Sequence, residues 1–157
     1  MDLYETLKWL HILSSTVLFG TGIGTAFQMV MAMRTRNPQT VAHTANHVVL
    51  ADWLFTTPAG IAQPLTGLGL IHAAGNSLTE PWLLATYALY LLACACWAPV
   101  VHLQINIRNA ARTAAAAGQP LPASALRAYR IWFALGWPAF AALTAVFWLM
   151  VSKPQLW

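Results

Sequence analysis

Acidic residues are scarce in this sequence: its 157 residues include four, against eight lysines and arginines, and charged residues make up 8% of the chain. So little charge excludes a soluble domain of ordinary composition, because a domain of this size must present a polar surface to water. Hydrophobic residues make up 59% of the chain, and its mean hydropathy is +0.58. The composition predicts an integral membrane protein embedded in a lipid bilayer.

Cysteine is almost absent, because Cys94 and Cys96 are the only two. Side chains two positions apart on a helix point to nearly opposite faces, which excludes a disulfide or a shared metal between them. We predict that both pack against neighbours. The start of the chain also lacks the basic segment and small-residue cleavage site of a signal peptide, so we expect the first apolar segment to be retained.

The length suits about four membrane-spanning helices at roughly 20 apolar residues each and leaves no room for a separate soluble domain. Apolar runs and helix breakers predict helices over residues 4–33, 41–74, 82–117 and 124–151. Pro58 and Pro64, with glycines around them, predict a kink in the second helix. The predicted fold is all-α, a single four-transmembrane-helix domain over residues 1–157.

Basic residues lie at the ends of the apolar runs, which is typical of membrane topology rather than of nucleic-acid binding. The first and third connections and their flanks carry the arginines, namely Arg34, Arg36, Arg108, Arg112, Arg127 and Arg130. The connection between the second and third helices carries no Lys or Arg. The positive-inside rule therefore predicts both termini on the outer side of a bacterial inner membrane. Interfacial tryptophan anchors are expected at Trp9, Trp82, Trp132 and Trp157.

His11 lies inside the first apolar run, where an ionisable side chain is costly to expose to lipid and usually faces the bundle interior. At about 100° per residue, small and hydroxyl residues share its stripe of the helix, together with Leu18 and Met29. Those residues are Ser14, Ser15, Gly22 and Thr25. Small and polar residues favour close helix contacts, so we expect this face to pack against its neighbours.

The second helix has two polar faces that cannot both point inward. One carries Asp52, Thr56, Gln63 and Thr66, and the nearly opposite one carries His43, His47 and His72. A buried acid is costlier to expose to lipid than a neutral histidine near an interface, so we assign the Asp52 stripe to the interior. On the third helix, a broad face carries Tyr87, Tyr90, Cys94, Trp97, Gln104 and Arg108. We therefore expect Asp52 to pair with Arg108 or to hydrogen-bond Gln104.

Two interpretations of His11 stay open. In the first it is an axial ligand of haem b near the outer side, with Ser15 and Trp97 also contacting the cofactor. In the second its ring is hydrogen-bonded to a serine or a backbone carbonyl. The aromatic fourth helix suits either the walls of a planar cofactor site or plain bundle packing.

Asp52 also has two readings, a proton-relay or substrate-binding acid and a structural ion pair that fixes the kinked helix. In the haem-binding interpretation, the central cavity is lined or supported by Asp52, Thr56, Gln63, Trp97 and Gln104. His43 and His47 have the spacing of metal ligands, but no third ligand shares their segment, so we predict that they are surface residues. A two-haem arrangement would use His11 and His72 on the outer side and His47 and His102 on the inner side. It would need the face of the second helix that we assign away from the interior.

Several segments resemble one family of membrane proteins along nearly the whole chain. They are residues 7–12 (LKWLHI), the glycine-rich middle of the first helix, and residues 51–56 (ADWLFT), 63–67 (QPLTG) and 97–101 (WAPVV) with Gln104-Ile105. These motifs resemble the predicted integral membrane proteins of domain-of-unknown-function family 2269. More distantly, the opening of the first helix is similar to HemJ-type protoporphyrinogen oxidases and CopD membrane domains. The HemJ resemblance implies haem binding at His11 alone.

We therefore expect a small inner-membrane protein that binds haem b through His11 and has a redox or haem-related role. A redox partner or quinone, or a second copy of the chain, would be its partner, and nucleic acid would not. One alternative is a non-enzymatic membrane subunit or scaffold. The other is CopD-like metal handling by His11 and Met29, which lie about 27 Å apart along one helix and would need separate sites. No general base or nucleophile stands in a reactive constellation, so an enzymatic role is left open.

Overall fold

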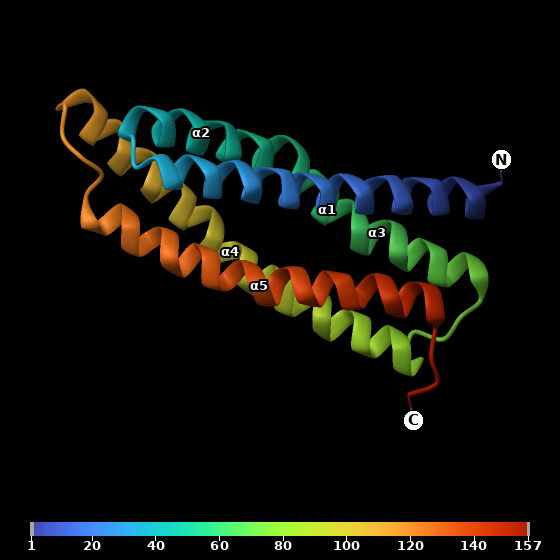
Figure 1. The fold of residues 1–157 in the computed structure, drawn as a ribbon. Helices are drawn as coiled ribbons and strands as arrows, with labels where there is room; N and C mark the ends of the chain where they lie inside the picture. Colours follow the sequence, from blue (N-terminus) through green and yellow to red (C-terminus); the bar gives the residue numbers. More distant parts are fainter. Residues whose placement is uncertain (1, 157) are drawn as a thin grey trace.

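The computed structural model describes residues 2–156 as an all-α bundle (Figure 1). Its elements are α1 (Leu3–Thr35), α2 (Pro38–Ala51), the π-helical segment η1 (Asp52–Thr56), α3 (Thr57–Ala74), α4 (Pro81–Ala116) and α5 (Ala123–Ser152). Because α2, η1 and α3 follow one another without a break, they form one rod, and the predicted four-helix bundle is confirmed. The second rod begins at Pro38, three residues before the predicted start at Val41.

Local capping explains where the first connection lies. The Asn37 side chain accepts hydrogen bonds from the backbone N–H groups of Gln39 and Thr40, at 2.9 and 3.2 Å. Pro38 occupies the first turn of α2, where its missing N–H costs no hydrogen bond. Arg36 ends α1 in the left-handed conformation, with φ of 53°. A connection this short forces α1 and α2 to run antiparallel.

The predicted kink in the second rod takes the form of a π-helical turn just before Pro58. Proline lacks the N–H that would bond the carbonyl four residues earlier. Just before it, the Thr57 N–H bonds the carbonyl of Asp52, five residues earlier, and the Thr57 hydroxyl donates to the same oxygen at 2.8 Å. The wider turn brings both Asp52 and Thr56 into the interior, at 4% and 7% exposure.

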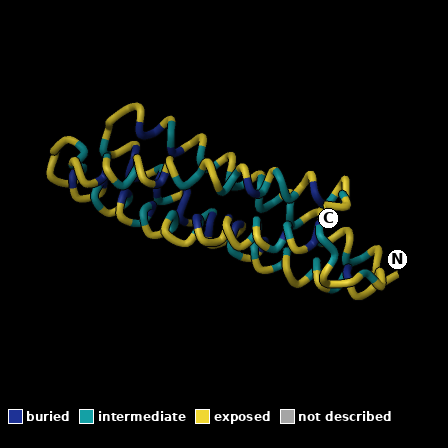
Figure 2. The backbone as a smooth tube through the Cα atoms, turned by 90° about the horizontal axis from the view of Figure 1, so that it is seen from below, coloured by how far each residue is buried: buried dark blue, intermediate teal, exposed yellow. Residues whose placement is uncertain are grey.

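The bundle consists of two antiparallel pairs. α1 packs along α2, η1 and α3, whereas α4 packs along α5, and the two pairs meet mainly where α2 contacts α4. Fully buried Met29, Val41, Val48 and Ile107 form the core at this meeting point. At the opposite end a smaller core joins α3, α4 and α5 through Ile71, Trp82, Leu83 and Leu149. Exposed positions follow the outer surface of the helices (Figure 2).

Both termini lie at one end of the bundle (Figure 1). The ends of α1 and α4 and the start of α5, which carry the arginines, lie at the other end. α1, α4 and α5 are long and apolar enough to cross a membrane, while the second rod is divided by η1 and is not among these spans. Its outward residues are nevertheless large and apolar, and Trp53, Leu54 and Phe55 are each more than half exposed. Such a surface suits contact with hydrocarbon rather than with water.

Two of the expected tryptophan anchors are wrong. Trp82 and Trp132 are 7% and 6% exposed and belong to the two cores, because their helices turn these positions toward neighbouring helices. Trp9 is 56% exposed, in keeping with an interfacial position, and Trp157 lies outside the described residues. Cys96 is buried, as predicted for a packed side chain, whereas the same prediction is wrong for Cys94, which is exposed on α4.

Candidate functional site

The first polar site joins α1 to α3 around His11. The imidazole Nδ1 lies 2.8 Å from the Thr66 hydroxyl oxygen, and the backbone carbonyl of Gln63 also lies beside the ring. The ring is half-buried between the two helices. His11 thus faces a neighbouring helix, as the analysis of its stripe predicts.

The hydrogen bonds around Thr66 assign the tautomer of His11. A threonine hydroxyl has one hydrogen to donate, and the Ala62 carbonyl lies 2.6 Å from the Thr66 oxygen, closer than the imidazole. The hydroxyl therefore donates to Ala62 and accepts the Nδ1–H of His11. This leaves the lone pair on Nε2, for which no hydrogen-bond partner is found among residues 2–156. A histidine whose Nδ1–H is held by an acceptor is arranged for coordination through Nε2.

Gln63 ties the same two helices together at the next turn. Its amide nitrogen donates to the His11 carbonyl at 2.8 Å and to the Ser14 hydroxyl oxygen at 2.6 Å. Ser14 in turn donates to the His11 carbonyl at 3.1 Å. The backbone that carries the imidazole is therefore fixed by a side chain of α3.

Replacing Gln63 with leucine should lower the free energy of unfolding by about 1 kcal/mol, since interhelical hydrogen bonds inside membranes contribute about 0.6 kcal/mol each on average. The loss stays modest because Ser14 still donates to the His11 carbonyl. Thermal unfolding in detergent would measure it. Gln28→Leu, at an exposed position of α1, is the matched control and should cause no loss. Equal effects of the two changes would contradict the interhelical role of Gln63.

Glycine at position 67 allows the imidazole to approach α3 closely. A Cβ atom added at Gly67 would lie 3.4 Å from Cε1 of His11, and one added at Gly69 would lie 3.0 Å from a methyl of Leu7. The α1–α3 contact therefore depends on missing side chains, the device that lets membrane helices pack closely.

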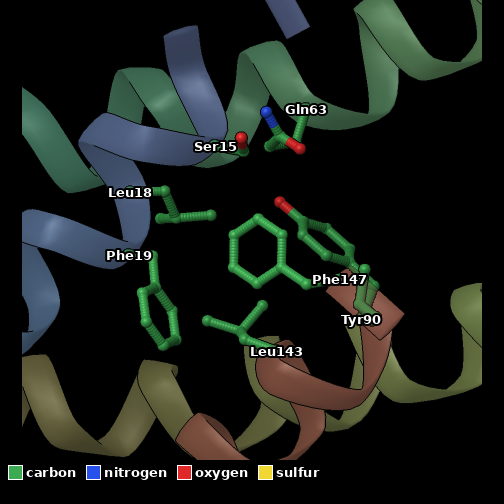
Figure 3. Close-up of a pocket in the computed structure, with 8 residues that line it drawn as sticks. Ser15, Leu18, Phe19, Gln63, Tyr90, Leu143 and Phe147 are labelled. Carbon is green, nitrogen blue, oxygen red and sulfur yellow. The ribbon is translucent and has the colours of Figure 1, made fainter. Parts of the chain in front are cut away.

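A small cavity of about 30 Å³ lies beside this site, between α1, α3, α4 and α5 (Figure 3). It is lined by Ser15, Leu18, Phe19, Gln63, Tyr90, Leu143, Val146 and Phe147. Tyr90 donates its hydroxyl hydrogen to the Gly60 carbonyl, and the phenol points toward the side of the cavity that holds Gln63 and Ser15. A volume of this size admits about one water molecule.

The cavity is far smaller than a haem site. Pockets for cofactor-sized ligands measure about 300–1,000 Å³, some ten times the volume found here. Phe19 closes the space by packing edge-on against Phe140 and Phe147, at ring-centre distances of 5.7 and 5.2 Å. The free Nε2 of His11 could therefore coordinate a haem iron. The helices around it, however, lie too close together in this structure to hold the porphyrin ring.

The second polar site surrounds Asp52 in the half of the bundle nearer the arginines. Oδ1 of Asp52 accepts the Thr56 hydroxyl hydrogen at 2.8 Å, and the side chain of Gln104 lies beside the carboxyl. The expected pairing with Arg108 is wrong, because the Arg108 Nε donates to Asn109 at 3.2 Å instead. Of the two partners that the sequence allowed, the structure places Gln104 next to Asp52.

The remaining candidate residues divide between these sites. Ser15 lines the cavity and donates to the Ile12 carbonyl at 2.7 Å. Trp97 is not among the cavity residues, and on α4 it stands about 24 Å from the helix start against about 12 Å for His11 on α1. His43, His47, His72 and His102 are all exposed.

Sequence reasoning missed the partners of His11. Gln63 and Thr66 were placed on the inner face of the second rod, but with the Asp52 stripe rather than opposite His11. Their spacing of three residues, with Gly67 next, was a usable signal for a contact with another helix. Tyr90 gave no such signal, because its hydroxyl bonds a backbone carbonyl.

A small all-α protein of four rods, with an ionisable side chain buried in each half and apolar outer surfaces, belongs to the class of polytopic membrane proteins. The comparisons give the family: the chain belongs to the one described as "Predicted integral membrane protein (DUF2269)", which matches residues 5–154. This confirms the resemblance that the sequence motifs indicated. No curated protein and no solved structure matches the chain.

Proposed function

We propose that this membrane protein binds haem b through Nε2 of His11 and has a redox or haem-related role. One observation carries the proposal, the hydrogen-bond chain from His11 through Thr66 to the Ala62 carbonyl. It holds the Nδ1–H and directs the lone pair of Nε2 away from the Thr66 contact, the arrangement found at metal-binding histidines.

A bound haem would supply one-electron chemistry, and the chain would supply its position and surroundings. Thr66 would fix the ring orientation, Gln63 would fix the backbone of His11, and the apolar walls would exclude water. The electron partner expected for such a site is a second redox protein or a quinone dissolved in the same membrane.

Haem binding requires the α4–α5 pair to move away from α1 and α3, since the present cavity holds about 30 Å³. The contacts that resist this motion are apolar, between Phe19 on α1 and the phenylalanines of α5. Near the cavity, one hydrogen bond joins the two pairs, between Tyr90 and the Gly60 carbonyl.

The deciding measurement is an absorption spectrum of the detergent-purified protein, oxidised and then reduced with dithionite, before and after addition of haemin. Wild type is expected to show a Soret band and reduced-state α and β bands, and His11→Ala should lose them because no other histidine is buried. His72→Ala, at an exposed position near the same end, is the matched control and should keep the full spectrum. A wild type that stays colourless with added haemin would overturn the proposal.

A non-enzymatic membrane subunit is the second candidate, and a groove on the outer face of α5 favours it. It is lined by Trp137, Phe140, Ala141, Thr144, Ala145 and Trp148, and the two tryptophans are 68% and 59% exposed. Small residues one turn apart allow a second helix, from a partner or another copy of the chain, to approach closely. A colourless protein that co-purifies with one membrane partner at a fixed ratio would favour this function.

Metal handling of the CopD type has less support. His11 offers one nitrogen ligand, Met29 is fully buried in the core at the other end of α1, and no group of three or more His, Cys, Asp or Glu side chains is found in the described chain. A soft or borderline ion at His11 alone would need further ligands from another molecule.

A further inference from the structure

Among residues 2–156, Asp52 is the only acidic residue that is buried inside the bundle. Asp2 and Glu5 cap the start of α1, where each accepts a backbone N–H of the other. Glu80 lies in the connection before α4 and accepts the indole N–H of Trp82 at 2.6 Å. Asp52, in contrast, lies in η1 and is 4% exposed. A negative charge on its carboxyl would therefore lie inside the helix bundle.

One carboxyl oxygen of Asp52 accepts a hydrogen bond, and the other has no hydrogen-bond partner among the described residues. Thr56 donates to Oδ1, while Oδ2 is buried and has no partner among the described residues. Gln104, on the facing side of α4, is 3% exposed, and its Oε1 also lacks a partner. The Gln104 side chain lies beside the carboxyl, yet Oδ2 of Asp52 has no hydrogen-bond partner among the described residues.

No cation faces Asp52 from any helix packed against η1. Between His11 and Arg34, α1 has no ionisable residue, and the titratable residues of α2 and α3, namely His43, His47 and His72, are exposed. On α4, His102 is exposed, and the two arginines bond asparagines, Arg108 with Asn109 and Arg112 with Asn46. In the described chain no ion pair accounts for this acid.

We propose that Asp52 is a proton-binding site whose carboxyl holds its proton on Oδ2. An ionised carboxylate buried here without a cation is costly, whereas the protonated carboxyl is neutral and can both donate and accept hydrogen bonds. One hydronium proton from the aqueous phase converts the carboxylate to the acid and gives the buried Oδ2 a hydrogen to donate. No bond other than the new O–H forms.

The π-helical turn supports this assignment. Such turns interrupt the regular ladder and are frequent at functional sites. Here the turn places Asp52 and Thr56 on the interior face together, and the Asp52 carbonyl is satisfied by Thr57 rather than by the regular ladder. A metal cation is less suited to the site than a proton, because hard cations take six or more oxygen ligands.

Infrared spectroscopy of the whole protein in detergent tests the proposal at neutral pH. Wild type should show a carboxylic-acid C=O band that shifts in heavy water and disappears as the pH is raised. Asp52→Asn should remove it, and the matched change Glu80→Gln should leave it intact, because Glu80 lies in the connection before α4 rather than inside the bundle. Isotope-labelled aspartate should shift the same band in wild type, which assigns it even if Asp52→Asn fails to fold.

Two outcomes would overturn the proposal. The absence of a carboxylic-acid band in folded wild type at neutral pH would show that Asp52 is ionised. Loss of the band on adding sodium chloride at constant pH would assign the site to a metal cation instead. Neither result depends on haem binding at His11, so the two proposals fail or stand separately.

Discussion

Met29→Ala is expected to lower the free energy of unfolding by about 2–5 kcal/mol, the range for deleting a fully buried long apolar side chain. Met29 is completely buried where α1 meets α2 and α4, beside Val41, Val48 and Ile107. In a bilayer the loss comes from van der Waals contacts rather than from water exclusion, because lipid tails are as apolar as the side chain.

Phe27→Ala is the matched control on the same helix. Phe27 is 65% exposed on the outer side of α1 and contributes little to the packing between helices. Denaturant titration of the purified protein in one detergent compares the two variants with wild type. If Phe27→Ala proved as destabilising as Met29→Ala, the core would not lie where the structure places it.

Gly67→Val is expected to displace His11 and abolish ligand binding at that residue. Even a Cβ would approach Cε1 of the imidazole to 3.4 Å, and the valine methyls extend further into the space that the ring occupies. Because Thr66 holds the ring on one side, α1 must move or the Nδ1 hydrogen bond must break. Overpacking of this kind costs about 1–3 kcal/mol of stability.

Gly20→Val separates this effect from a general effect of replacing glycine. A Cβ at Gly20 would meet nothing within 4 Å, so valine is accommodated there, and it forms helix better than glycine does. Thermal unfolding and haemin titration of both variants are the measurements. Normal haem uptake by Gly67→Val in a haem-binding wild type would contradict the placement of His11 against α3.

The two polar sites lie at different positions along the long axis of the bundle. His11 and its partners lie in the half that contains both termini, and Asp52 with Gln104 lies toward the arginines. Between them stand Tyr90, the Gly60 carbonyl and the small cavity. A membrane interior that retains this many polar groups is consistent with a functional bundle, since each such group is costly to bury.

Periodicity along each helix determined much of this arrangement. The regular turn of the helix fixes which side chains share a face, so the sequence alone predicted that Asp52 and Thr56 point inward while His43, His47 and His72 point outward. The apolar runs and the helix-breaking residues between them likewise predicted the number and order of the four rods. A segment that spans a membrane must satisfy its own backbone hydrogen bonds, so each apolar run forms a helix.

Contacts between helices were decided only in three dimensions. The shift and rotation of one helix relative to another depend on how side chains from both helices fit together. The pattern of residues within a single helix does not determine them. The π-helical turn at η1 adds to this, because it changes the rotation of every residue after it. For this reason the sequence located His11 and Asp52, whereas tertiary packing decided that Thr66 and Gln63 hold His11 and that Gln104, not Arg108, stands beside Asp52.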